Sequence, residues 1–199
     1  MLLLIVMNVS AQRTVLHCGQ LIDVKTGRVL KEMSIVTEGN KITAIDKGYI
    51  NAGANERLVD LKALTVMPGL IDSHVHMEIE TNPNRYMETF TFNPADYAFQ
   101  SVQFAERTLM AGFTTVRDLG GSGVNISLRN AITKKLIRGP RIITAGKSIA
   151  TTGGHADPTN GYRRDLMDDP GPDRGVVNGK DDSRKAVRQR YKEGSDLIR

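Results

Sequence analysis

From Leu64 onward, short apolar strand patterns alternate with helix patterns, and this alternation constrains the fold more than any other feature of the sequence. The run "LTVMPGLID", residues 64–72, is nearly continuously apolar, as in a strand that is covered on both faces. The strand patterns "FTTVRDL" and "RIITAG" follow, each after a helix pattern. This order is typical of an α/β protein with a parallel sheet.

The helix patterns have clear start and stop residues. Asn93 and Pro94 provide an N-cap and a proline at the first helical position, and Gly112 can end that helix. A second helix is marked by Leu128, Ile132 and Leu136. The segment 181–194 predicts a third helix, and "SDLIR" predicts the start of a fourth strand. We therefore expect about four βα units within residues 67–199.

Residues 12–66 have a different pattern, with short β-branched runs separated by turn residues. Turns are predicted at residues 25–27 and 38–40, the second of them closing a hairpin. We expect a small antiparallel β module here. His17 lies in its first strand and Cys18 is the only cysteine, so a disulfide framework is excluded.

The first residues, "MLLLIVMNVSAQ", combine a short apolar run with small residues before Ala11. Residues 1–11 predict a signal peptide that is cleaved after Ala11, and therefore a periplasmic or secreted protein. The usual Lys or Arg before the apolar run is missing, so a mis-assigned start followed by a β-strand is the alternative. The run is too short to span a membrane.

The formal charge of +5 raises the question of nucleic-acid binding. Lys and Arg crowd residues 163–199, but Asp and Glu are interleaved with them and aromatic residues are nearly absent. A solvated helical face explains this pattern better than a surface for nucleic acid. We expect neither nucleic-acid binding nor a membrane span.

The segment "GLIDSHVHM" places His74 and His76 at the end of the first parallel strand. Residues i and i+2 of a strand point to the same side, about 6–7 Å apart, so both imidazoles can face one ion while Val75 packs on the other side. Enzymes built on (β/α) barrels have their active sites at this end of the strands. The alternative is that the pair ends a strand by chance or makes hydrogen bonds in a loop.

Taken together, "PGLIDSHVH", "GFTTVRDLGG" and "GPRIITAG" resemble the first three strands of the amidohydrolase superfamily. The resemblance implies a (β/α)8 TIM barrel preceded by a small β-sandwich, with residues 12–66 as the sandwich and 67–199 as part of the barrel. It also implies a divalent metal, zinc by default and one or two ions, held in part by His74 and His76. The best-fitting subgroup resembles Xaa-Pro dipeptidases, with imidazolonepropionase-like hydrolases as neighbours.

In that subgroup the loop after the third strand looks like "TTGGHADPTNG", residues 151–161. The resemblance implies that His155 faces the substrate, and a surface histidine is the alternative. Arg163 and Arg164 could neutralise a substrate carboxylate, although solvated side chains are favoured. For Arg117 and Asp118, at the end of the second strand, an ion pair is favoured over a catalytic role.

The family's remaining ligands follow later strands, and no residue of this chain can be named as the catalytic acid or base. Arg199 stands where the family has a lysine that bridges two metals, and a guanidinium cannot readily take that role. A closed barrel needs about 200–250 residues, so we expect the N-terminal half of a hydrolase acting on C–N bonds. Its missing ligands would come from a longer chain or a partner chain, and we expect a homo-oligomer or a missing C-terminal half. The alternative is an inactive, truncated remnant that acts as a binding or oligomerising module.

Overall fold

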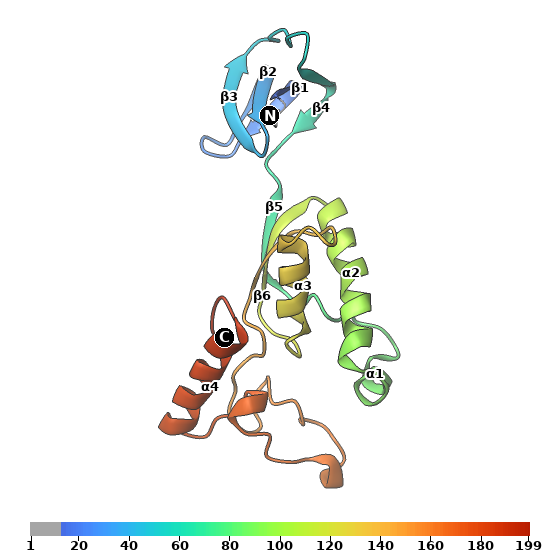
Figure 1. Cartoon of the computed structure of the whole chain (residues 1–199), viewed down its shortest axis with the longest axis vertical. Helices are drawn as coiled ribbons and strands as arrows, with labels where there is room; N and C mark the ends of the chain where they lie inside the picture. Colours follow the sequence, from blue (N-terminus) through green and yellow to red (C-terminus); the bar gives the residue numbers. More distant parts are fainter. Residues whose placement is uncertain (1–12) are drawn as a thin grey trace, which may run out of the picture. The chain divides into compact units, whose positions relative to one another are not determined.

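The computed structural model describes residues 13–199, so the predicted signal peptide at residues 1–11 lies outside the described residues. The chain divides into two compact units, Met1–Pro68 and Gly69–Arg199 (Figure 1). The run "LTVMPGLID" is not one strand, because one strand ends at Val66 and the next begins at Leu70. Pro68 lies between them and has no N–H for a sheet ladder.

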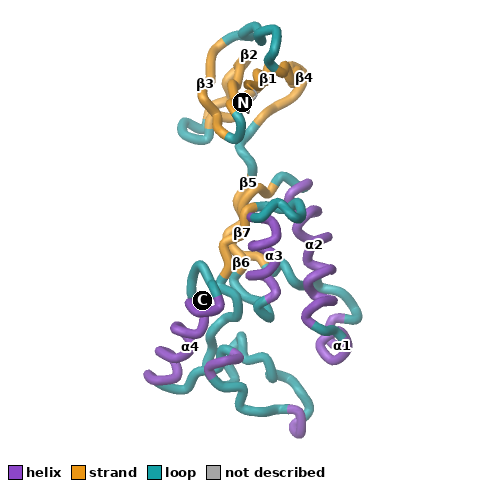
Figure 2. The backbone as a smooth tube through the Cα atoms, viewed as in Figure 1, coloured by secondary structure: helices purple, strands orange, loops and turns teal. Residues whose placement is uncertain are grey.

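The first unit is a mixed four-stranded sheet (Figure 2). Its strands are β1 (Arg13–Asp23), β2 (Arg28–Glu38), β3 (Lys41–Lys47) and β4 (Arg57–Val66), in the order β3-β2-β1-β4. The two predicted turns are confirmed, since β1–β2 and β2–β3 are antiparallel pairs. However, β4 pairs parallel to β1, so the predicted antiparallel module is wrong, and within residues 13–68 the strands form one sheet rather than two stacked sheets.

Two buried polar residues hold the connection that leads to β4. The Ser34 hydroxyl donates to the Gly48 carbonyl (2.8 Å) and accepts from the Ile50 N–H (3.1 Å). His17 Nε2 lies 2.7 Å from the Ile50 carbonyl oxygen. Because a carbonyl oxygen only accepts, this nitrogen carries the proton. His17 is thus a buried structural histidine. The core of the unit comprises Cys18, Leu21, Met33 and Ile35.

The second unit contains a parallel sheet in the order β5-β6-β7. Its strands are β5 (Leu70–Val75), β6 (Phe113–Asp118) and β7 (Arg141–Thr144). Its helices are α1 (Arg85–Thr91), α2 (Pro94–Met110), α3 (Val124–Thr133) and α4 (Lys180–Glu193), with short 3-10 turns at Arg164–Leu166 and Pro172–Arg174. The predicted order of strands and helices is confirmed from β5 to α4, apart from α1, which had no clear sequence signal.

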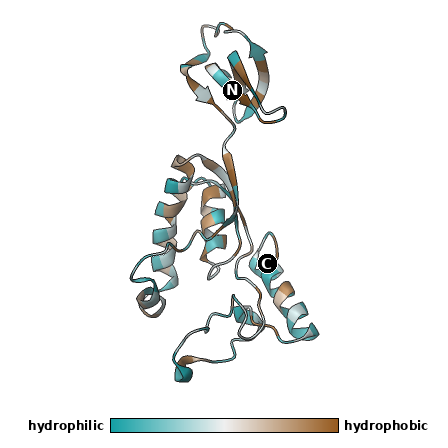
Figure 3. Ribbon diagram, turned by 180° about the vertical axis from the view of Figure 1, so that it is seen from behind, coloured by the Kyte–Doolittle hydropathy of each residue, from teal (hydrophilic) through white to brown (hydrophobic). Residues whose placement is uncertain are grey.

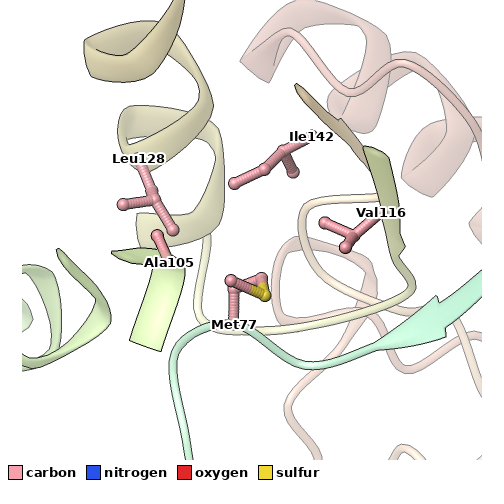
Figure 4. Close-up of a cluster of buried hydrophobic side chains, with 5 residues drawn as sticks. All are labelled: Met77, Ala105, Val116, Leu128 and Ile142. Atoms are coloured by element: carbon pink, nitrogen blue, oxygen red, sulfur yellow. The ribbon is translucent and has the colours of Figure 1, made fainter. Parts of the chain in front are cut away.

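Helices α2 and α3 cover one face of this sheet. The buried side chains between them and the strands are Met77, Ala105, Val116, Leu128 and Ile142 (Figure 4). The predicted start of α2 is confirmed, since Asn93 is the N-cap and its N–H donates to the Asp96 carboxylate (2.7 Å). Burial of the apolar faces of these helices therefore fixes the sheet on that side.

The other face of the sheet is open. Val116 and Ile142 are register partners in the core, so their neighbours Arg117 and Ile143, also partners, point the opposite way. On that side Ile71 is 72% exposed and Ile143 is 39% exposed. The start of β5 is among the hydrophobic segments in Figure 3. In the predicted fold, this uncovered face, on which Ile71 and Ile143 lie beside Arg117, is the inner side of a barrel.

Two sequence predictions fail at element ends. Residues 195–199 do not form a fourth strand. The Asp196 N–H donates to the Thr144 carbonyl, but the Thr144 N–H donates to the Asp196 side chain, which takes the place of the next ladder bond. Helix α3 ends at Thr133, and Leu136 lies beyond it, 73% exposed, after Lys135 adopts a left-handed conformation (φ 58°). In residues 13–199 no helix is long and apolar enough to cross a membrane.

Candidate metal and substrate site

The two predicted metal ligands lie side by side at the end of β5. His74 belongs to the strand and His76 follows it directly. Their ring centroids are 5.4 Å apart with the planes at 69°. Val75, between them, packs against the core on the other side of the sheet. The structure therefore brings the two imidazoles together in the way that alternation along a strand predicts.

A hydrogen bond determines which nitrogen of His76 is available. Nδ1 lies 2.7 Å from the Gly120 carbonyl oxygen. A carbonyl oxygen can only accept, so Nδ1 carries the proton and Nε2 of the neutral ring keeps its lone pair. Metal-binding histidines use this arrangement, donating one ring N–H to a carbonyl or carboxylate and binding the metal through the other nitrogen. His76 therefore fits the role of a metal ligand.

The pair by itself is an incomplete metal centre. In residues 13–199 no three His, Cys, Asp or Glu side chains are placed to hold one ion together. Catalytic zinc sites have three protein ligands and an open position. The described residues thus offer a pair of imidazoles, which is fewer side chains than such a site requires.

Two buried carboxylates lie behind the histidines. Asp118, fully buried at the end of β6, accepts hydrogen bonds from the N–H groups of Met77 (3.0 Å) and Gly120 (3.1 Å) and from the Asn125 amide (3.1 Å). Glu78 accepts from the N–H groups of Ser122 and Asn125, both at 2.7 Å. These carboxylates join the loop after β5 to the loop after β6.

The favoured ion pair between Arg117 and Asp118 is wrong. Consecutive strand residues point to opposite faces, so Asp118 is buried on the helix side whereas Arg117 is exposed and donates to the Ser73 carbonyl (2.7 Å). Burial raises the pKa of Asp118, and the hydrogen bonds from Met77, Gly120 and Asn125 oppose that rise. All three neighbours donate, which is the pattern that an ionised carboxylate requires.

A cavity of about 450 Å³ lies beside His76. His155 also lines it, so the structure brings the predicted substrate residue to the same pocket as one predicted metal ligand. The charged residues in its lining are Lys147, Arg174 and Arg199, and none of the described Asp or Glu residues lines it. Such a pocket is suited to an anionic group.

The cations differ from those considered in the sequence. Arg163 and Arg164 do not line the cavity, and Arg163 is paired with Asp165 on the exposed surface. Lys147 and Arg174 line it instead, and nothing in the sequence distinguishes them from solvated residues. Arg174 is paired with Asp168 (2.7 Å), whereas Lys147 forms no ion pair within residues 13–199.

The loop that carries His155 is organised by Asp157. Its carboxylate accepts from the Gly153 N–H (2.9 Å) and from the N–H and hydroxyl of Thr159 (3.0 and 2.8 Å). These hydrogen bonds lower the pKa of Asp157. The carboxylate closes the loop on both sides of His155.

Arg199 lies in the same pocket as His76. Its guanidinium donates to the Leu119 carbonyl (3.1 Å), and its own carbonyl accepts from the Ile149 N–H (2.8 Å). The side chain therefore places a permanent positive charge in the cavity.

Comparison with known proteins agrees with this architecture. Residues 65–199 match the model of the Amidohydrolase family, and the chain belongs to that family. It is similar to a crystal structure of a Xaa-Pro dipeptidase with bound methionine in the active site, at 46% identity and a TM-score of 0.82. It is also similar to a prolidase complexed with N-methylphosphonate-L-proline, at 32% identity and a TM-score of 0.79.

A curated relative is ochratoxinase from Aspergillus niger, 26% identical over 209 residues. The matches cover most of this chain but less than half of the other proteins. The match with the dipeptidase covers 94% of this chain and 46% of the dipeptidase. The corresponding shares are 92% of this chain and 45% of the prolidase, and 96% of this chain and 42% of ochratoxinase. The chain thus spans under half the length of the proteins that it matches.

Proposed function

We propose that this chain provides the first metal ligands and part of the substrate pocket of a metal-dependent hydrolase that cleaves amide bonds. Its preferred substrates in this proposal are Xaa-Pro dipeptides. The observation that carries the proposal is the hydrogen bond from His76 Nδ1 to the Gly120 carbonyl, because it leaves Nε2 free for an ion beside a cationic cavity. The similarity to a Xaa-Pro dipeptidase and a prolidase supports the substrate class.

In this proposal, His74 and His76 hold a divalent ion, with zinc as the default. When bound, such an ion supplies Lewis-acid activation of the scissile carbonyl and of a water molecule. The remaining ligands come from outside the described residues. Within this chain, the hydrogen bond to Gly120 orients the His76 ring.

The cationic pocket has a separate task, which is to hold the free carboxylate of the substrate. Lys147 is suited to it because it has no carboxylate partner in residues 13–199. His155, on its closed loop, lines the same cavity and can donate a further hydrogen bond. A dipeptide with a free C-terminus would thus be oriented with its amide towards His76.

The test uses the intact protein expressed from its gene, loaded with zinc and offered a panel of dipeptides and cyclic amides. We expect hydrolysis of Xaa-Pro dipeptides and weaker activity on the same peptides with an amidated C-terminus. Lys147→Met should raise KM about 10–100-fold for the free acid and less for the amide, since a hydrogen bond to a charged group is worth about 1.5–3 kcal/mol. Lys192→Met, on the exposed side of α4, is the control and should leave the KM for both the free acid and the amide unchanged.

Absence of turnover on the whole panel would refute the hydrolase. Equal activity on free and amidated peptides would refute the proposed carboxylate pocket but would leave the proposed hydrolase activity standing.

A second candidate is an inactive module that associates with another copy or another protein. The observation that favours it is the open face of the sheet, where Ile71 and Ile143 are exposed. It predicts no turnover together with a stable dimer in light scattering, whereas measurable zinc-dependent hydrolysis would exclude it.

A further inference from the structure

A single carboxylate holds both sides of the hydrogen bond that orients His76. One oxygen of Asp118 accepts the N–H of Met77 (3.0 Å), the residue that follows His76. The other oxygen accepts the N–H of Gly120 (3.1 Å), whose carbonyl receives the proton on His76 Nδ1 (2.7 Å). The backbone that carries the imidazole and the backbone that carries its acceptor are therefore tied to the same side chain.

The side chain of Asp118 has no polar partners in residues 13–199 other than these N–H groups and the Asn125 amide. The side chain is fully buried, and within residues 13–199 it forms no ion pair with Lys or Arg. A buried carboxylate is costly unless hydrogen-bond donors compensate it. Its donors are two backbone N–H groups and the amide of Asn125, which also donates to the Gly146 carbonyl (3.2 Å).

The loop that carries the Gly120 carbonyl, residues 120–125, is also held by a second carboxylate. Glu78 accepts the N–H groups of Ser122 and Asn125, so the segment from Gly120 to Asn125 is fixed at both ends by buried carboxylates. Of the two carboxylates, only Asp118 bonds directly to Gly120 and to the residue next to His76. It is therefore the group whose loss would move the Gly120 carbonyl relative to the ring.

We propose that Asp118 is a positioning residue that fixes the tautomer and the orientation of His76 through the backbone of Met77 and Gly120. The proton of a neutral histidine resides on the nitrogen for which a suitable acceptor is present. If the Gly120 carbonyl shifts, both tautomers become accessible and Nε2 is no longer held as the lone-pair nitrogen. The consequence for metal binding rests on the proposed function, whereas the effect of Asp118 on the His76 tautomer does not depend on it.

The decisive variant is Asp118→Asn, which keeps the shape of the side chain. Both oxygens of Asp118 accept N–H groups, so the amide NH₂ must face a donor whichever way it is turned. The first readout is long-range ¹⁵N–¹H correlation of the His76 ring in the metal-free intact protein, at a pH where the ring is neutral. We expect the Nδ1–H tautomer alone in the wild type and a mixture in the variant.

The second readout is zinc affinity, measured by competition with a chromophoric chelator. Loss of an outer hydrogen-bond partner typically weakens metal binding about 10–100-fold, and we expect a loss of that size for Asp118→Asn. Val116→Ala is the matched control, because Val116 is fully buried on the same strand and face, and its side chain cannot accept a hydrogen bond from the backbone of Met77 or Gly120. It should lower stability and leave both the tautomer and the zinc affinity unchanged.

The proposal is overturned if Asp118→Asn keeps His76 wholly in the Nδ1–H form, or if Val116→Ala shifts the tautomer equally. If Asp118→Asn does not fold, the wild type still provides a test. Slow exchange of the Met77 and Gly120 amides with an Nδ1–H ring supports the proposal, and fast exchange of both or an Nε2–H ring overturns it. An inactive protein that shows the expected tautomers would overturn the proposed function but not this inference.

Discussion

Gly121→Ala tests the packing behind the site most sharply. A Cβ at this position would collide with Oε1 of Glu78 and lie 2.6 Å from its Cδ and 3.0 Å from the Asn125 amide nitrogen. Glu78 is buried and its oxygens are engaged at 2.7 Å with two backbone N–H groups, so it cannot yield without breaking them. A hydrogen bond to a charged group is worth about 1.5–3 kcal/mol, and overpacking costs about 1–3 kcal/mol.

Losing one of the two bonds or accepting the overlap therefore predicts a loss of roughly 1–3 kcal/mol in the free energy of unfolding. Urea unfolding followed by circular dichroism measures it. Ser122→Ala is the control, because it keeps the backbone N–H that donates to Glu78 and should change stability by less than about 0.5 kcal/mol. A Gly121→Ala protein as stable as the control would refute the packing of Glu78 described above.

Three further predictions concern the pH, the core and the N-terminus. The pKa of Asp157 is lowered in the folded state, so its contribution to the His155 loop is present above the ordinary value of 3.8 and is lost as the pH falls through the lower folded value. Amide exchange of Gly153 should accelerate over that range, and Asp157→Asn should abolish the dependence. Leu128→Ala should cost about 2–5 kcal/mol in urea unfolding, because Leu128 lies in the core between α3 and the sheet. If the signal-peptide prediction is correct, mass spectrometry of the mature protein should find Gln12 first, whereas a retained Met1 would contradict it.

Local rules were sufficient for much of the second unit. The start of α2 follows from Asn93 and Pro94, because a cap and a first-turn proline act within a few residues. The two histidines share a side because strand alternation is a local property. The meeting of His76 and His155 in one cavity came instead from the family resemblance, since the two residues are far apart in the chain.

The predictions that failed concern residues whose placement depends on partners far away in the sequence. Alternation along β6 would have placed Asp118 on the same face as Val116, but a buried carboxylate is not expected without knowledge of its donors. Glu78 was missed for the same reason, because its partners belong to a loop more than forty residues later. The fourth strand failed because a side chain, that of Asp196, competes for the ladder position. Tertiary hydrogen bonds decide these cases, and no local pattern encodes them.

The central claim, that His74 and His76 are metal ligands, is tested most directly by zinc X-ray absorption of the intact protein. The account predicts that at least two imidazole nitrogens lie about 2.0–2.1 Å from the zinc, and that the double variant His74→Ala/His76→Ala loses this signal and binds zinc much more weakly. A double variant that binds zinc as tightly as the wild type, with an unchanged spectrum, would contradict it.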